Sequence, residues 1–293
     1  MSRRPAPSRP ILVTAFRGWN DGAQGATLAA GFLARAWSAE RFADIDPEEF
    51  FDFQAVRPHV SLEDGLTRRI EWPENAFYDA SMALREGAGV RDAIILIGIE
   101  PNTRWRTFTG EIIELAQTLD VELVVTLGAL LADVPHTRPS PVTGAATDPA
   151  LVEELGLSVS RYEGPTGIVG ILHSACRSAS IDSVSLWAAV PHYASLAPSP
   201  KAALSLCRRL GELVSVELEL EELERAAEVY ERQVSEAVAA DEETAAYVRE
   251  LERHADELAE TEDLPSGDTL AAELTRFLQE HEARRREEED SAD

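Results

Sequence analysis

The sequence has very little of three residue types on which common chemistries depend. Lys201 is the only lysine among 293 residues, and there are two cysteines and six histidines. Chemistry that needs a lysine, such as a Schiff base or a phosphate-binding loop, therefore has one candidate. Cys176 and Cys207 both lie in apolar stretches with helical spacing. We expect them to be buried thiols in a reducing compartment, not a disulfide framework or a zinc site.

The common catalytic and cofactor-binding motifs are also missing. The sequence contains no Walker loop, no G-x-S-x-G elbow, and no H-E-x-x-H or C-x-x-C pair. Gly18, Gly22 and Gly25 do not have the spacing of a dinucleotide fingerprint. The six histidines are scattered without the spacing of a ligand pair. We therefore predict no cofactor, no metal site and no catalytic residue set.

Positive charge is scarce as well. The chain has 27 Lys and Arg against 53 Asp and Glu residues, a net charge of −26. Residues 201–293 contain 28 acidic and 11 basic side chains, so −17 lies there and −9 in residues 1–200. Such a balance argues against nucleic acid and against an anionic membrane surface as partners. The apolar run at 11–16 is too short for a signal peptide or a membrane span, so we expect a cytoplasmic protein.

Apolar runs typical of buried strands alternate with amphipathic stretches over residues 11–215. The run at 93–99 is continuously apolar, which indicates burial on both faces as in a parallel sheet. Strands are expected at 11–16, 50–56, 68–72, 93–99, 123–127, 159–162 and 183–190. Helices are expected after residue 25 and at about 112–119, 149–155, 164–176 and 200–214. The pattern predicts an α/β fold with a mostly parallel sheet flanked by helices.

The composition changes after residue 215. Apolar residues from Leu220 to Ala237 recur at spacings of three and four, which predicts a long amphipathic helix. Asp241 suits the N-cap of a second helix, and a third is expected at 270–278. The predicted organisation is a flexible N-terminal arm at 1–10, an α/β core at 11–215, a helical extension at 216–283 and a disordered acidic tail at 284–293.

The stretch from Val121 to Gly144 is the first place to look for function. A predicted strand at 123–127 is expected to end at Gly128 and to lead into a long, proline-rich loop. Sites in open α/β sheets gather beyond the carboxyl ends of the strands. The polar and aromatic residues that follow predicted strands or open predicted helices are our candidate ligand or interface residues: Asn20, Asp21, Glu100, Arg104, Trp105, His136, Arg138, Thr166 and His192.

Two glycine-rich helix starts, at 18–25 and 164–170, leave two interpretations open. Backbone N–H groups at such starts favour an anion, but the glycines also suit tight turns and close packing. Asn20 and Asp21 suit the N-cap of the first of these helices. Glu100 is expected to form an ion pair with Arg104 or Arg106, which would lower the pKa of its carboxyl group. His173 and Ser174 are interpreted as packing residues.

Several short sequence motifs together resemble those of the proteasome assembly chaperone 2 family in its bacterial long form. They include GWNDGAQGA at 18–26, GIEP at 98–101, LGALLADVPHTRP at 127–139, YEGPTG at 162–167 and LWAAVPHY at 186–193. The resemblance implies a fold similar to nucleoside phosphorylases and hydrolases, and a role in assembling or regulating the proteasome core. It also implies homo-oligomers, with a trimer favoured. Relatives that dock on the core use a hydrophobic-Tyr-x tail, which the final residues DSAD lack.

The sequence therefore favours a non-enzymatic protein of the chaperone family that acts through contacts with itself and with proteasome core subunits. The alternative is a nucleoside- or anion-binding protein, or an enzyme, with a pocket formed by the loops at 17–25, 100–106, 135–144 and 164–167.

Overall fold

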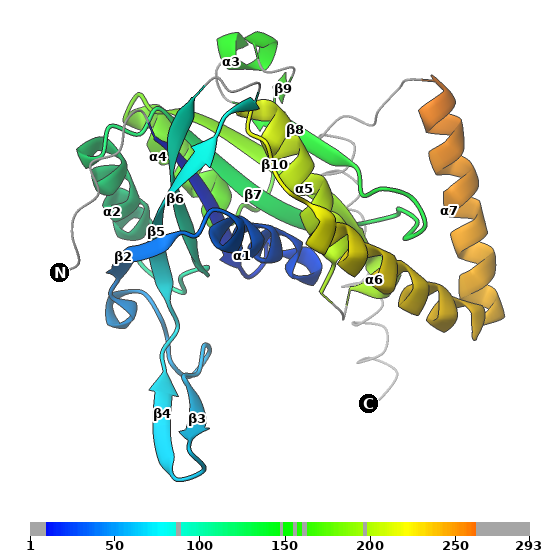
Figure 1. The fold of residues 1–293 in the computed structure, drawn as a ribbon, viewed down its shortest axis with the longest axis horizontal. Helices are drawn as coiled ribbons and strands as arrows, with labels where there is room; N and C mark the ends of the chain where they lie inside the picture. Colours follow the sequence, from blue (N-terminus) through cyan, green and yellow to red (C-terminus); the bar gives the residue numbers. More distant parts are fainter. Residues whose placement is uncertain are drawn as a thin grey trace.

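The computed structural model describes residues 10–85, 89–146, 149–154, 157–159, 163–195 and 198–261. An eight-stranded sheet forms the centre of the molecule, in the order β2-β5-β6-β1-β7-β10-β8-β9 (Figure 1). The strands are β1 Ile11–Arg17, β2 Glu40–Ile45, β5 Asn75–Ala83, β6 Val90–Ile99, β7 Leu123–Ala132, β8 Val142–Ala146, β9 Ser158–Val159 and β10 Asp182–Pro191.

The four central strands β6, β1, β7 and β10 are parallel. Val13 on β1 lies between Ile95 on β6 and Val125 on β7. On either side, β5 and β8 add to this centre in the antiparallel direction. Because the central strands share one direction, the loops that leave their carboxyl ends emerge at one edge of the sheet.

Helices cover both faces of the sheet. One face carries α1 Gly25–Ala36, α5 Pro200–Leu213 and α6 Glu221–Ala239, and the other carries α2 Trp105–Thr118 and α4 Ile168–Ser178. Alternate residues of β1 supply the two cores: Val13 packs with α1 and α5, whereas Leu12 packs with α2 and α4. The other helical elements of the described residues are α3 Pro149–Glu154, α7 Glu242–Thr261 and the 3-10 turns η1 Gly22–Gln24, η2 Pro47–Glu49 and η4 His192–Ala194.

The predicted α/β fold, with a mostly parallel sheet between helices, is confirmed. The strand predicted at 50–56 is wrong. Phe50 and Phe51 are buried by packing after the turn η2, and the carbonyl of Phe50 accepts hydrogen bonds from the backbone N–H groups of Asn102 and Thr103. Their apolar character reflects this loop packing and not a place in the sheet. Strands β2, β3 (His59–Glu63), β5 and β8, by contrast, were not predicted.

Gly128 does not end its strand, and β7 continues to Ala132. The neighbouring strand β10 places the indole ring of Trp187 directly over Gly128. A Cβ atom at position 128 would lie 2.4 Å from Cε3 of Trp187. The glycine is therefore needed for the close approach of an aromatic ring and not for a turn.

Helix α6, which follows residue 215, packs on the core. Leu223 and Ala227 of α6 are buried in the same cluster as α1 and α5. Asp241 caps α7, because its carboxylate accepts the backbone N–H groups of Glu243 and Thr244. The predicted domain boundaries stay predictions. The first nine residues of the predicted N-terminal segment 1–10, the helix at 270–278 and the tail at 284–293 lie outside the described residues.

A separate hairpin projects from the body (Figure 1). It consists of β3 His59–Glu63 and β4 Thr67–Glu71, and the second strand confirms the prediction at 68–72. The two strands form a sheet of their own.

Candidate functional site

The structure divides the candidate residues at the sheet edge into two clusters. The carboxylate cluster, which follows β1 and β6, contains Asn20, Asp21 and Glu100. The helix clamp follows β7. It contains His136, Thr137 and Arg138 together with the side chains of α5, α6 and α7 that bond to them. In the first cluster Asn20 bonds to Glu100, and in the second His136 and Arg138 bond to side chains of α6 and α7. A single pocket formed by these loops stays a prediction.

Glu100 lies at the N-terminus of α4. One carboxylate oxygen, Oε1, accepts the backbone N–H of Ile168 at 2.8 Å and the side-chain amide of Asn20 at 3.3 Å. The other, Oε2, accepts the backbone N–H of Trp19 at 3.3 Å. The lack of a side chain at Gly167 lets Asn20 and Glu100 lie close to the start of α4, since a Cβ atom there would lie 2.4 Å from Nδ2 of Asn20. The carboxylate thus occupies the end of the helix that favours negative charge.

The carboxylate of Asp21 lies in the same way at the N-terminus of α1. Its Oδ1 atom accepts the backbone N–H groups of Ala26 at 2.9 Å and Thr27 at 3.1 Å, and its Oδ2 atom accepts the hydroxyl of Thr27 at 2.5 Å. Burial raises the pKa of Asp21 above its ordinary value, although these hydrogen bonds oppose the change. The N-cap position of α1 is Gln24, so the prediction of Asn20 or Asp21 at that position is wrong. The Asp21 carboxylate nevertheless bonds to N–H groups of the first turn from outside the helix, whereas Asn20 bonds to Glu100.

Each of the two glycine-rich helix starts is thus occupied by a carboxylate of the chain itself. This arrangement favours a structural role for both starts over an external anion site. The expected ion pair of Glu100 with Arg104 is wrong. Arg104 instead pairs with Glu49, and its guanidinium lies 5.7 Å from the centre of the Phe50 ring.

Trp105 and Thr166 lie at helix starts near the carboxylate cluster. The indole N–H of Trp105 donates to the carbonyl of Pro101 at 2.6 Å, which anchors the start of α2. Thr166 is exposed, and its hydroxyl donates to the carbonyl of Gly167 at 3.4 Å.

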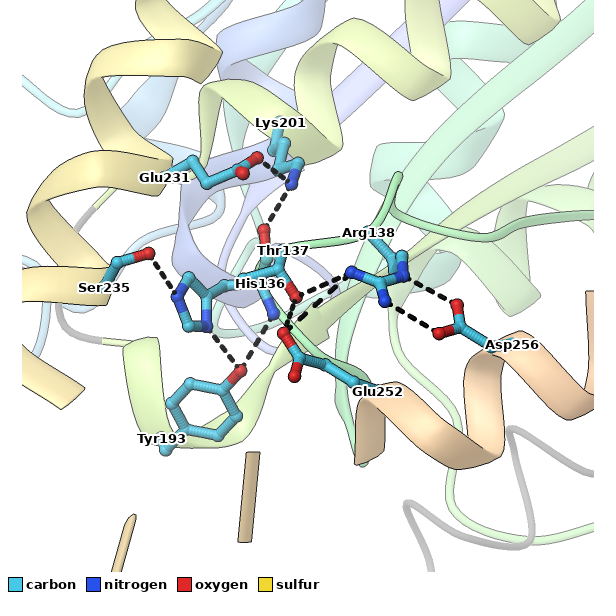
Figure 2. A network of polar contacts seen from close by, with 9 residues as sticks. All are labelled: His136, Thr137, Arg138, Tyr193, Lys201, Glu231, Ser235, Glu252 and Asp256. Atoms are coloured by element: carbon cyan, nitrogen blue, oxygen red, sulfur yellow. Dashed lines mark hydrogen bonds and ion pairs between the residues drawn. The ribbon is translucent and has the colours of Figure 1, made fainter. Parts of the chain in front are cut away.

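The helix clamp surrounds residues 136–138 with side chains from three helices (Figure 2). Lys201 of α5 donates to the carbonyl of His136 and pairs with Glu231 of α6 at 2.5 Å. The hydroxyl of Thr137 donates to Glu252 of α7 at 2.5 Å. The only lysine of the chain is therefore used to hold a loop.

Arg138 forms a bidentate ion pair with α7. Its Nε and Nη2 atoms each lie 2.7 Å from a carboxylate oxygen of Asp256. The pair lowers the pKa of Asp256 and raises that of Arg138. Arg138 is thus an internal anchor for α7, and sequence reasoning missed Glu252 and Asp256 because only the fold brings α7 to this loop.

His136 is buried between Tyr193 and Ser235. The Tyr193 oxygen accepts the backbone N–H of His136 at 2.8 Å and lies 2.9 Å from Nδ1 of the ring. The other ring nitrogen, Nε2, lies 2.9 Å from Oγ of Ser235, so both nitrogens of the neutral imidazole form have a hydrogen-bond partner. Burial, and then the charge of Lys201, lowers the pKa of His136, which favours this neutral form.

The contact between the ring of His136 and the hydroxyl of Ser235 joins the loop after β7 to α6. Burial also raises the pKa of Tyr193 to about 12, so Tyr193 stays neutral. The three side chains therefore form a hydrogen-bonded contact between the loop, η4 and α6.

His192 lies beside the clamp, with Nδ1 3.2 Å from a carboxylate oxygen of Asp133. Asp133 also accepts the hydroxyl of Tyr247 at 2.9 Å, which adds a further contact between the strand end and α7. Among the described residues, no group of three or more His, Cys, Asp or Glu side chains is arranged to hold a metal ion. In the same part of the chain, no helix is both long and apolar enough to cross a membrane.

These features define a three-layer α/β protein whose strand-end residues bond mainly to one another and to its C-terminal helices. The sequence pattern of the PAC2 family matches residues 15–238, so the chain belongs to this family. The resemblance to proteasome assembly chaperones is confirmed at this level. The likeness to nucleoside phosphorylases stays a prediction.

Solved structures agree with this assignment. A PAC2 family protein from Streptomyces avermitilis is 47% identical, with a TM-score of 0.75 over 82% of this chain and 99% of the other. A proteasome-assembly chaperone homologue from Mycobacterium tuberculosis is 45% identical, with a TM-score of 0.72 over 81% and 99%. A second M. tuberculosis protein, of unknown function, is 26% identical, with a TM-score of 0.79 over 94% of each chain. No curated protein matches the chain.

Proposed function

We propose that this chain is a non-enzymatic, proteasome-assembly-chaperone-like protein that acts in the cytoplasm through protein–protein contacts. Its partners in this proposal are proteasome core subunits and further copies of itself, with a trimer favoured. The observation that carries the proposal is family membership over residues 15–238, together with the 45% identity to a proteasome-assembly chaperone homologue.

The geometry at the sheet edge supports this function over the small-molecule alternative. Glu100 and Asp21 fill the two helix starts that would otherwise hold a phosphate or carboxylate ligand. His136 and Arg138 bond to η4, α6 and α7, so their polar atoms already have partners.

The test is capture of purified proteasome α-subunits by the immobilised full-length protein. The control is an unrelated protein of similar net charge, because a chain of charge −26 attracts basic surfaces without specificity. We expect capture above this control. Equal capture by both proteins would refute the proposal.

Two exposed apolar residues allow a sharper version of the same assay. Trp19 lies at the carboxyl edge of the central strands and is 47% exposed, whereas Val90 begins β6 at the opposite edge and is 69% exposed. If the strand-end edge contacts the α-subunits, Trp19→Ala weakens capture and Val90→Ala does not. Equal effects of the two changes would place the contact elsewhere.

A further inference from the structure

The hairpin β3–β4, which we call the arm, has one apolar and one polar face. Val60 pairs with Ile70 and Leu62 with Arg68, so three of these four side chains form an apolar face. Val60 and Leu62 are 62% and 63% exposed. The other face carries the pairs His59–Glu71, Ser61–Arg69 and Glu63–Thr67. The arm therefore presents apolar side chains to solvent over its whole length.

The arm contacts the body at its base, where the ring of Trp72 packs on that of Phe53 with 4.9 Å between centroids. Within the described part of the chain, β3 and β4 pair only with each other. A two-stranded hairpin is marginally stable in water, and its free edges are templates for another strand.

The sequence of β3, His59-Val-Ser-Leu-Glu63, is complementary to itself when two copies run antiparallel about Ser61. His59 then faces Glu63 of the other copy, and Val60 faces Leu62. Both pairs are of the kinds that stabilise neighbouring strands, one through opposite charge or a hydrogen bond and one through apolar contact. We propose that the free edge of β3 pairs with β3 of a second copy of this chain, which forms a four-stranded antiparallel sheet across a two-fold axis.

The charges of the arm favour β3 over β4 as the contact. A two-fold pairing of β4 would place Arg69 opposite Arg69 of the other copy and Arg68 opposite Ile70. Like charges directly opposite one another destabilise a strand pair.

The charges also favour the arm over the rest of the surface. Residues 57–72 contain three arginines and three acidic side chains, so they are neutral in a chain of charge −26. Two acidic copies therefore repel each other least where their arms meet.

This contact specifies how copies of the chain associate. It rests on the proposed function only for the assumption that the chain binds further copies of itself. Because the contact is two-fold, it joins copies in pairs, and a trimer built through another surface would become an assembly of six chains. Capture of α-subunits does not require the contact.

A disulfide cross-link in the full-length protein tests the pairing directly. Antiparallel partners have Cα atoms about 4.5–5.5 Å apart, within the range of a disulfide, so Ser61→Cys is expected to give a covalent dimer on mild oxidation. Thr67→Cys is the matched control, because it lies on the same polar face but on β4. The two β4 strands would be three strand spacings apart, roughly 14 Å. The native Cys176 and Cys207 are buried and do not interfere.

A charged side chain placed at the two-fold axis of the proposed strand pair gives an independent test, in which the mass of the assembly is measured. Ser61→Lys places two ammonium groups opposite each other, so its mass by light scattering should fall to half that of the wild-type assembly. Thr67→Lys adds the same charge to the same face and should keep the wild-type mass. Circular dichroism confirms that both variants are folded.

Three results would overturn the inference: no cross-link in Ser61→Cys, an equal cross-link in Thr67→Cys, or a wild-type mass for Ser61→Lys. Packing of two apolar arm faces would leave Ser61 on the outside and would give the first result. A different protein as the partner of the arm would also give the first result. Absence of α-subunit capture by the wild-type protein, with the Ser61→Cys cross-link formed, would count against the proposed function alone.

Discussion

The replacement Lys201→Met tests whether the clamp holds α6 and the 136–138 loop together. The Lys201 side chain is 12% exposed and donates to the carbonyl of His136 and to Glu231. Methionine keeps most of the stem and removes both hydrogen bonds. A buried carbonyl that loses its donor costs about 1–3 kcal/mol. The carboxylate of Glu231 is 39% exposed and can be hydrated in the variant. The lost ion pair with Glu231 therefore contributes less than about 1 kcal/mol to the destabilisation.

We therefore expect Lys201→Met to lower the free energy of unfolding by about 2 kcal/mol. For a chain of this size the thermal midpoint falls by roughly 4 °C. Urea unfolding at pH 7, followed by circular dichroism, measures the change. The charge of Lys201 also contributes to the lowered pKa of His136, so this pKa should rise in the variant. NMR titration of the imidazole measures that effect separately from stability.

The matched control is Arg208→Met, which removes an exposed ion pair between the same two helices. Arg208 and Glu224 are 2.6 Å apart, and both side chains are nearly half exposed. Such a pair contributes less than about 1 kcal/mol. If Lys201→Met were no less stable than Arg208→Met, or left the pKa of His136 unchanged, the clamp would not have the role described.

Three further predictions concern other parts of the molecule. Burial lowers the pKa of His173 from 6.5 to about 4, because the folded protein favours the neutral imidazole. The folded protein therefore has its full stability above pH 6.5 and loses stability as the pH falls towards 4. About 2 kcal/mol should disappear between pH 7 and pH 5 in urea unfolding, and His173→Gln should remove this part of the loss. Glu100→Ala removes the carboxylate at the start of α4 and should cost about 1–2 kcal/mol in the same assay; a change near zero would show that it does not act as a cap. Gly128→Ala places a methyl group against Trp187 and should cost about 1–3 kcal/mol, with a changed near-ultraviolet dichroism of the indole, and an unchanged spectrum would contradict the close contact.

Local patterns predicted the elements whose burial follows from their own sequence. The run at 93–99 is apolar without interruption and forms the centre of β6, buried between two layers of helices. The spacing of three and four from Leu220 predicted α6, and Asp241 predicted the start of α7. Prediction failed at 50–56, because aromatic residues that pack under a loop have the same composition as a strand.

The sequence by itself determined the class of fold and the family, since both depend on periodicity and on short words that neighbouring residues carry. Only the tertiary structure decided what the stretch from Val121 to Gly144 does. His136 meets Ser235 across 99 positions, and Glu100 meets Ile168 across 68. These pairs form because strands far apart in the chain are neighbours in the sheet and because α6 and α7 return to its carboxyl edge, an arrangement that depends on packing between distant segments.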